Sequence, residues 1–259
     1  IFLNNITEFN NFKCIITSRP AYIDSTRFEN VVEVQEFDIG KVDSFYAKIT
    51  GNKLENKEKI ESNLEVLGIP VILYMAIMSD VDIERNSTKS ELYNRIFAER
   101  GGIFDKFCSD GISYDKANQI LRDPKNIKKY LNFLASIAFE MFEANTLVLQ
   151  KEKSSIPELE IGEGKISVLE FPIKHLFEST EFNVEFIHKT IYEYFVSEHI
   201  FYSICEGITL SKHELAGVLG KLLKKDILSP EILEFLKYKI INSRLKDKFD
   251  IINESFDLM

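Results

Sequence analysis

His188 is the residue of this sequence whose position is best suited to chemistry. It lies where Val184 to Phe186, which alternate as in a short strand, give way to apolar residues at helical spacing. The first N–H groups of a helix have no partner within the helix and can bind an anion. The partial positive charge of a helix start disfavours protonation of the imidazole. A neutral ring can still donate one N–H to a phosphate oxygen while the protein holds its other nitrogen.

Arg19 is a second candidate for anion binding. It stands in the polar sequence Thr17 to Pro20, directly after the apolar residues Cys14 to Ile16. This pattern is typical of a strand buried on both faces, and open α/β sheets bind ligands at the carboxyl ends of their strands. A second parallel strand is predicted at Val31 to Phe37. The alternative is a strand that ends in a proline-containing turn with a solvent-exposed arginine.

Motifs of other chemistry are absent from the sequence. There is no G-x-x-x-x-G-K-(S/T) phosphate-binding loop, and no apolar strand ends in a paired acidic motif for Mg²⁺. The four histidines show no metal-binding spacing, and G-x-S-x-G does not occur. The three cysteines are far apart in apolar surroundings, which favours buried reduced thiols. We therefore expect no catalytic residue and no metal site in this chain.

The residues around His188 resemble a known family motif. Phe186 to Phe195 is similar to the F-x-H-x-(S/T)-x-x-E-Y-F signature in the winged-helix domain of NACHT-type STAND NTPases, which are ATP-dependent, NLR-like molecular switches. Thr17 to Pro20 resembles the sensor 1 motif of this family, whose arginine reaches the γ-phosphate. Gly68 to Val71 resembles its G-x-P motif, whose proline packs on adenine. The resemblance thus implies nucleotide contacts at Arg19, Pro70 and His188.

The resemblance and the periodicity together predict a mainly α fold with minor β. Residues 1–37 are expected to be the last strands of an α/β nucleotide-binding sheet, and residues 38–110 a helical domain. Residues 111–205 are expected to form a winged-helix domain, and residues 206–259 the start of a helical sensor or arm domain.

Start and stop signals place the predicted helices of the middle region. Asp38 can cap a helix that Gly51-Asn52 ends. Pro70 suits the first turn of a buried helix, where its missing N–H is no loss. A polar helix is predicted from Glu55 to Leu67. Apolar spacing predicts a helix from Glu91 to Phe107 that is interrupted at Gly101-Gly102 and has Leu92, Ile96 and Phe104 on its inward face.

The helix after His188 is predicted to lie on a core. Its apolar stripe consists of Ile187, Ile191, Tyr194, Phe195, Phe201, Ile204 and Cys205. The opposite face, with Lys189, Glu193 and Ser197, is expected to be exposed. Further helices are predicted at Ile127 to Asn145, Ser211 to Lys225 and Ser229 to Asn242, the last with Ser229 as its cap and Pro230 in its first turn.

Composition is that of an ordinary globular protein, because 45% of the residues are hydrophobic and 28% are charged. The longest apolar run is too short to span a membrane and no signal peptide is evident, so we expect a cytoplasmic protein. A net charge of −9 makes binding to nucleic acid or anionic lipid unfavourable. The basic cluster of Arg122, Lys125, Lys128 and Lys129 is interpreted as a solvent-exposed helix face.

The resemblance implies the regulatory half of a nucleotide-controlled switch in innate immunity or signalling. In such a parent protein, bound ADP holds the domains closed, and exchange for ATP opens them for self-association. The chain begins at Ile1 and is interpreted as a fragment whose partner is the missing P-loop half. ATP or ADP with Mg²⁺ would bind the full-length parent, whereas this chain alone should neither hydrolyse ATP nor bind it tightly. Two alternatives remain open, a winged-helix DNA-binding regulator and a plain helical interaction module.

Overall fold

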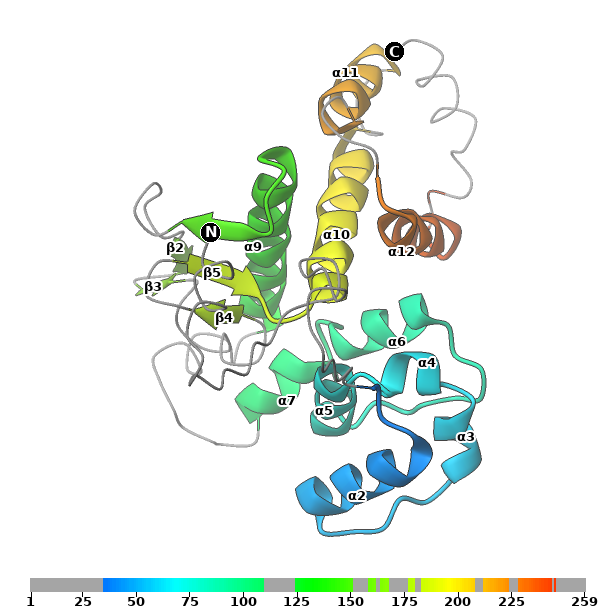
Figure 1. Cartoon of the computed structure of the whole chain (residues 1–259). Coiled ribbons are helices and arrows are strands. Elements are labelled where there is room, and N and C mark those ends of the chain that lie inside the picture. The colour runs from blue at the N-terminus through cyan, green and yellow to red at the C-terminus, as the bar shows by residue number, and fades with distance from the viewer. Residues whose placement is uncertain are drawn as a thin grey trace, which may run out of the picture. The chain divides into compact units, whose positions relative to one another are not determined.

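The computed structural model shows most of the chain from residue 35 onward (Figure 1). The described residues are 35–109, 124–150, 158–161, 164–167, 177–179, 183–207, 212–223, 228–243 and 245. The chain divides into two units, Ile1–Glu36 and Phe37–Met259, and nearly all described residues belong to the second. Arg19 and the first predicted strand lie outside the described residues.

The second predicted strand, Val31 to Phe37, is described only at its end. Gln35 to Phe37 have no regular secondary structure, so the prediction is wrong for these residues. The reason is the bonding of Phe37, whose N–H donates to the carbonyl of Gly68 at 2.8 Å and not to a neighbouring strand.

Short helices occupy the first part of the second unit. They are α2 (Ile39–Thr50), α3 (Lys57–Glu61), α4 (Leu64–Leu67), α5 (Pro70–Met78), α6 (Lys89–Ile96) and α7 (Ile103–Ser109). The predicted limits of α2 are confirmed. Asp38 Oδ1 accepts the N–H of Lys41 at 2.8 Å, and Gly51 ends the helix with φ at 73°, a conformation that favours glycine.

The polar helix predicted from Glu55 to Leu67 is wrong as a single helix, because it breaks between α3 and α4. Asn63, which is only 3% exposed, occupies the break. Its side-chain N–H₂ donates to the carbonyls of Lys59 at 2.6 Å and Glu84 at 2.9 Å. This amide ties α3 to the segment that leads into α6.

The predicted interruption near Gly101-Gly102 is confirmed, although it is longer than expected. Helix α6 already ends at Ile96, and α7 begins at Ile103. A Cβ atom at Gly102 would lie 2.2 Å from the carbonyl oxygen of Ala98, so only glycine fits this turn. Leu92, Ile96 and Phe104 are buried as predicted.

The described β-structure is small and antiparallel. Strands β1 (Val148–Gln150), β5 (Asn183–Phe186) and β4 (Phe177–Ser179) form one sheet in the order β1-β5-β4, and β2 (Glu158–Ile161) pairs with β3 (Gly164–Ser167). Because β5 is central and leads directly to His188, the sheet fixes the point where the next helix begins.

Helix α10 (Lys189–Gly207) is the centre of packing in the later part of the unit. It packs on α9 (Pro124–Glu143), α12 (Pro230–Ile241) and α11 (Lys212–Leu223), and α9 lies alongside it in Figure 1. The predicted helices in these regions are confirmed. The predicted cap of α12 is also confirmed, since Ser229 Oγ accepts the N–H of Ile232 at 3.2 Å.

The solvent-exposed face predicted for α10 is wrong at two of its three positions. Lys189 is exposed, but Glu193 is 2% exposed and Ser197 is fully buried. Helix α12 covers this face, because Ser229 at its start donates to Glu193 Oε1 at 2.9 Å.

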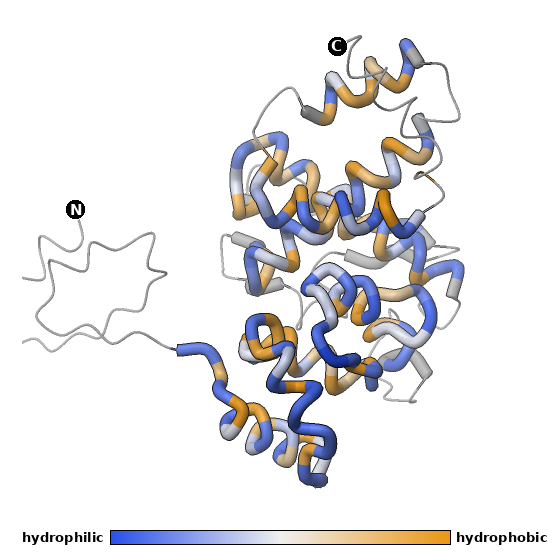
Figure 2. Tube along the Cα trace, turned by 90° about the vertical axis from the view of Figure 1, so that its right-hand side faces the viewer, coloured by the Kyte–Doolittle hydropathy of each residue, from blue (hydrophilic) through white to orange (hydrophobic). Residues whose placement is uncertain are grey.

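Hydrophobic residues recur along the described helices, as Figure 2 shows by colour. The largest fully buried side chains belong to several of these helices and include Tyr93, Phe104, Tyr130, Phe195 and Phe235. Among the described residues helix is the main secondary structure, which confirms the mainly α fold with minor β. The division into four named domains stays a prediction.

Candidate functional site

The G-x-P sequence lies at the start of α5, as predicted. Pro70 is the first helical residue and is exposed, whereas the helix behind it is buried at Ile72, Leu73 and Met75. Gly68 accepts the N–H of Phe37, so the turn before Pro70 is tied to the residue that precedes the cap of α2. The helix start is therefore confirmed, and the contact of Pro70 with adenine stays a prediction.

An open groove of about 360 Å³ lies along the start of α2. Its lining residues are Phe37, Asp38, Gly40, Lys41, Ser44, Phe45 and Lys48. The rings of Phe37 and Phe45 meet edge to face with centroids 5.6 Å apart. Lys41 and Lys48 add ammonium groups, although Lys41 Nζ lies 4.0 Å from a carboxylate oxygen of Asp38. Aromatic surface beside cations suits a planar ring that carries negatively charged groups.

His188 forms the start of α10. Its carbonyl accepts the N–H of Ile191 at 3.0 Å, and its ring Nδ1 accepts the N–H of Thr190 at 3.2 Å. A ring nitrogen that accepts a hydrogen bond carries no proton, so a neutral imidazole here is protonated on Nε2. The predicted position and the hold on one ring nitrogen are confirmed. The contact with phosphate stays a prediction.

The structure connects only part of the predicted nucleotide site. The hydrogen bond between Phe37 and Gly68 joins the turn before Pro70 to the groove on α2. Helix α5 packs mainly on α4, α6 and α7, whereas α10 packs mainly on α9, α11 and α12. Pro70 and His188 therefore stand at the starts of two helices that do not pack mainly on each other, and neither residue lines the groove. Arg19 lies outside the described residues.

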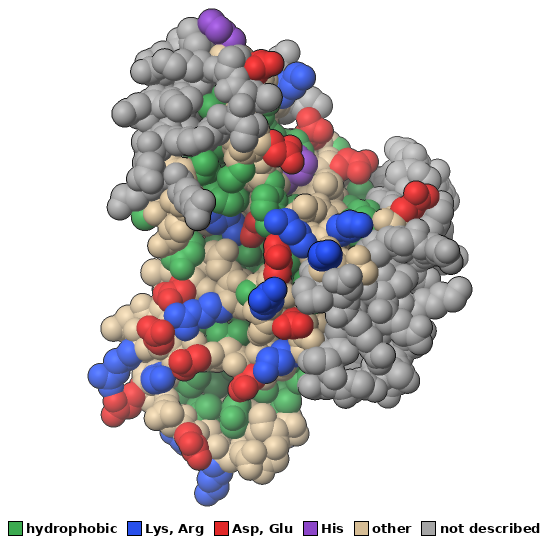
Figure 3. All heavy atoms as spheres, turned by 180° about the vertical axis from the view of Figure 1, so that it is seen from behind, with side chains coloured by type: hydrophobic (Ala, Val, Ile, Leu, Met, Phe, Trp, Pro, Cys, Tyr) green, Lys and Arg blue, Asp and Glu red, His purple; other side chains and the backbone are tan. Residues whose placement is uncertain are grey.

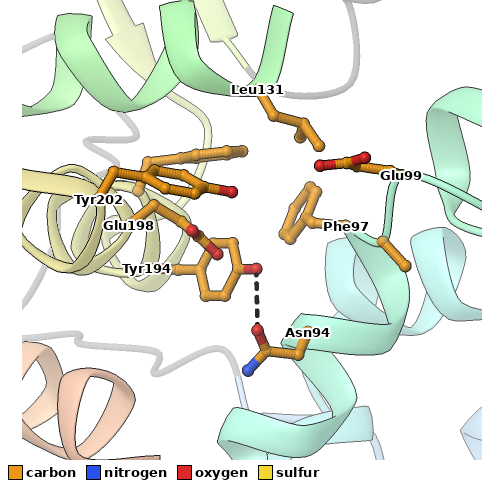
Figure 4. A pocket seen from close by; sticks show the side chains of 9 residues that line it. Asn94, Phe97, Glu99, Leu131, Tyr194, Glu198 and Tyr202 are labelled. Atoms are coloured by element: carbon orange, nitrogen blue, oxygen red, sulfur yellow. Dashed lines mark hydrogen bonds between the residues drawn. The ribbon is translucent and has the colours of Figure 1, made fainter. Parts of the chain in front are cut away.

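A second cavity, of about 150 Å³, lies where α6, the residues after it, α9 and α10 come together (Figure 4). It is lined by Asn94, Phe97, Ala98, Glu99, Leu131, Tyr194, Phe195, Glu198 and Tyr202. In Figure 4 the hydroxyl of Tyr194 points to the side chain of Asn94, to which it donates at 3.4 Å. Aromatic rings and two carboxylates therefore share one small cavity.

Lys239 of α12 reaches the polar residues of this cavity. It is only 6% exposed, and its Nζ donates to Asn94 Oδ1 at 2.8 Å and forms an ion pair with Glu198. The ammonium also lies 4.2 Å from the centroid of the Tyr194 ring, close enough for a cation–π interaction. Burial lowers the pKa of Lys239, and the Glu198 carboxylate opposes this shift.

The carboxylate of Glu198 also affects two phenols, the buried Tyr194 and the half-buried Tyr202. Burial raises the pKa of Tyr194, and the negative charge of Glu198 raises it further. The same two causes, in the same order, raise the pKa of Tyr202. Both tyrosines therefore remain neutral hydrogen-bonding groups at physiological pH.

Sequence reasoning missed both polar contacts of α12 with α10. At the start of α12, Ser229 binds the buried carboxylate of Glu193, which also lies 3.1 Å from Lys189 Nζ. At its other end, Lys239 binds Glu198. One signal was present, since Ile191 to Val196 contains a single charged residue. A helix that is apolar almost all round is covered on all sides.

Among the described residues, the basic cluster is exposed and the metal-binding residue types form no cluster. Lys125, Lys128 and Lys129 are exposed as predicted, and Lys128 Nζ lies 3.7 Å from Glu99. Arg122 lies outside the described residues. Figure 3 shows acidic and basic side chains interspersed on the face that it displays. Among the residues with described positions, no three His, Cys, Asp or Glu side chains are placed to hold a metal ion.

Cys205 is the one cysteine whose side chain the structure describes. It is a half-buried free thiol, and burial raises its pKa. Cys205 packs against the core but is not fully buried, and its reduced state stays a prediction. Within the described part of the chain, no helix has both the length and the apolar character needed to cross a membrane.

Comparison with known proteins finds no protein-family model, no curated protein and no solved structure that matches this chain. Function is therefore inferred from the groove on α2, the capping of α10 by His188 and the contacts of Lys239.

Proposed function

We propose that this chain is the regulatory part of a nucleotide-controlled switch of the NACHT type. The observation that carries the proposal is the hydrogen bond of 2.8 Å between the N–H of Phe37 and the carbonyl of Gly68. It ties the G-I-P turn, which the resemblance assigns to adenine, to a groove with aromatic and cationic side chains. Two features with the chemistry of nucleotide binding, 31 residues apart in the sequence, are thus joined.

The chemistry of the groove suits the base end of a nucleotide. A nucleobase stacked on an aromatic side chain contributes about 1–3 kcal/mol. Exposed lysines such as Lys41 contribute about 0.2–1 kcal/mol each toward an anion, by analogy with surface ion pairs. With Lys41 and Lys48 the total is about 1.4–5 kcal/mol, a range that includes the roughly 4 kcal/mol of a millimolar dissociation constant. The groove alone therefore binds nucleotide weakly, and tight binding requires a P-loop from outside these 259 residues.

His188 is assigned the second contact in this proposal. Because Thr190 holds Nδ1, the proton of a neutral ring is on Nε2, the nitrogen that would donate to a phosphate oxygen. Such a charge-assisted hydrogen bond is worth about 1.5–3 kcal/mol. This corresponds to roughly tenfold to a hundredfold in the equilibrium between closed and open states.

The proposal includes the wider behaviour that the resemblance implies. ADP would hold the complete protein closed, with Mg²⁺ bound in its P-loop half. Exchange for ATP would open it and allow self-association in defence or signalling. Arg19 would contact the γ-phosphate. The 259-residue chain would have no ATPase activity of its own.

Nuclear magnetic resonance with isotope-labelled chain and millimolar ADP tests the proposal. We expect chemical-shift changes to concentrate in residues 37–48 and 68–71, and to saturate only at millimolar concentration. The double variant Lys41→Glu with Lys48→Glu should abolish them. The matched control, Lys221→Glu with Lys237→Glu, changes two exposed lysines on α11 and α12 and should leave them intact. Shifts that avoid these segments, or that both double variants reduce equally, would refute the proposed groove.

A further inference from the structure

Helix α12 binds two other helices through one continuous face. Its buried residues, Ile232, Phe235, Leu236 and Lys239, recur at three, four and seven positions, as on one side of a helix. Phe235 lies between Tyr93 of α6, with ring centroids 5.1 Å apart, and Tyr194 of α10, with ring centroids 5.4 Å apart. The side chain of Leu233, on another face, is 50% exposed. Helix α12 therefore covers the junction of α6 and α10.

Lys239 contacts both of these helices with one ammonium group. Its Nζ donates to Asn94 of α6 at 2.8 Å and pairs with Glu198 of α10. All three side chains meet only when α6, α10 and α12 are in register. The bonds of Lys239 therefore form only when all three helices are docked in this register. An apolar side chain at this position would depend much less on the register.

Two more polar contacts hold α12 along its length. At its start, Ser229 Oγ donates to the buried carboxylate of Glu193 on α10 at 2.9 Å. Near its middle, a carboxylate oxygen of Glu234 lies 3.6 Å from Nζ of Lys89 on α6. Helix α12 thus contacts α10 at its start, α6 near its middle, and both helices through Lys239 near its end.

A buried ion pair is a costly way to hold two helices together. Replacing such a pair by well-packed apolar residues is often neutral or stabilising, because both charges lose water when they are buried. Here both charges regain water if α12 leaves, so the pair favours the open state relative to an apolar interface. The ion pair therefore specifies one register of α12 and lowers the free energy needed for α12 to detach, relative to an apolar interface.

We propose that α12 is a detachable clamp that holds α6 against α10 when it is docked. Its release removes the link through Lys239 and uncovers the aromatic residues Tyr93 and Tyr194. Separation of α6 from α10 then becomes easier. The proposal rests on the contacts of α12 alone and holds whether or not the protein binds a nucleotide.

Native-state hydrogen exchange of the complete chain tests the clamp. In the wild type we expect the amides of α12 to exchange together, at least tenfold faster than those of α9. Lys239→Met and Glu198→Gln each leave one charge buried without its partner. Each should accelerate exchange in α12 tenfold or more and accelerate α6 as well, without changing α9.

Two further variants distinguish a clamp from general stabilisation. The double variant Glu198→Leu with Lys239→Met removes both charges, and exchange in α12 should return to the wild-type rate or become slower. Lys237→Met alters an exposed lysine on the same helix and should have no effect. Equal exchange of α12 and α9 in the wild type would overturn the proposal, and this comparison needs no variant to fold. Equal acceleration of α9 and α12 in the single variants would also overturn it.

Discussion

Replacing His188 with leucine removes the side-chain acceptor at the start of α10. The lost contact is the hydrogen bond of 3.2 Å from the N–H of Thr190 to Nδ1. The bond from Ile191 to the carbonyl of residue 188 uses the backbone and is expected to persist. Loss of a capping side chain costs about 0.5–2 kcal/mol. For a chain of this size, each kcal/mol lowers the melting temperature by about 2–4 °C.

His188→Asn is the matched variant, since asparagine caps helices well but has no imidazole. In thermal denaturation followed by circular dichroism, His188→Leu should be about 1 kcal/mol less stable than the wild type. The free energy of unfolding of His188→Asn should lie within a few tenths of a kcal/mol of the wild-type value. In a protein that also contains a P-loop half, both variants should release ADP faster if the imidazole contacts phosphate.

The two measurements refute different parts of the reasoning. If His188→Leu has the same melting temperature as the wild type, the ring of His188 does not stabilise α10. Normal ADP release from His188→Asn, together with loss of stability in His188→Leu, would make His188 a purely structural cap.

Three further predictions concern titration and turnover. Burial lowers the pKa of His199, whose ring stacks on Phe139 with centroids 4.2 Å apart. The unfolded chain therefore binds the proton of His199 more readily than the folded chain does. The free energy of unfolding should decrease as pH falls through 6.5. Its NMR titration midpoint should lie below 6.5 and rise in Phe139→Ala; an unchanged midpoint in this variant would contradict the effect of burial. Hydrogen bonds from Lys57 and from the N–H of Leu54 lower the pKa of Asp43. The ionised Asp43 carboxylate therefore stabilises the fold above pH 3.8, and this stabilisation is lost as pH falls through the pKa of the folded state. Its carboxyl should titrate below 3.8 and shift upward in Lys57→Met, whereas equal midpoints would exclude a role for Lys57. Purified chain should show no ATP turnover above a heat-killed control, and genuine turnover would contradict the dependence on a separate P-loop.

Helix limits were predictable where the signal acts within one turn of the backbone. Asp38 and Ser229 each accept an N–H three residues later, and Pro70 needs no acceptor for its own nitrogen. The break at Asn63 was not predictable in the same way. Its side-chain amide donates to the carbonyl of Glu84, 21 residues away. The spacing of apolar residues from Glu55 to Leu67 gives no information about that partner.

Long-range partners also explain the errors in the candidate site. Glu193 was expected in solvent because a charged residue usually is, but Ser229, 36 residues later, donates a hydrogen bond to it. Lys239 looks like any lysine on an amphipathic helix, and its partner Asn94 is 145 residues earlier. The position of His188 was predictable because its bonds are local, whereas Phe37, which lines the groove on α2, bonds to the distant carbonyl of Gly68.

The separation between Asn94 and Lys239 also affects how this chain is made. Ribosomes add about 5–20 residues per second, so Lys239 is added to the chain roughly 7–30 seconds after Asn94. During that interval Tyr93 lacks its partner Phe235, and Tyr194 lacks it too from the time that α10 is made. A nascent chain of this protein should therefore offer a chaperone an aromatic surface that closes only when synthesis reaches α12.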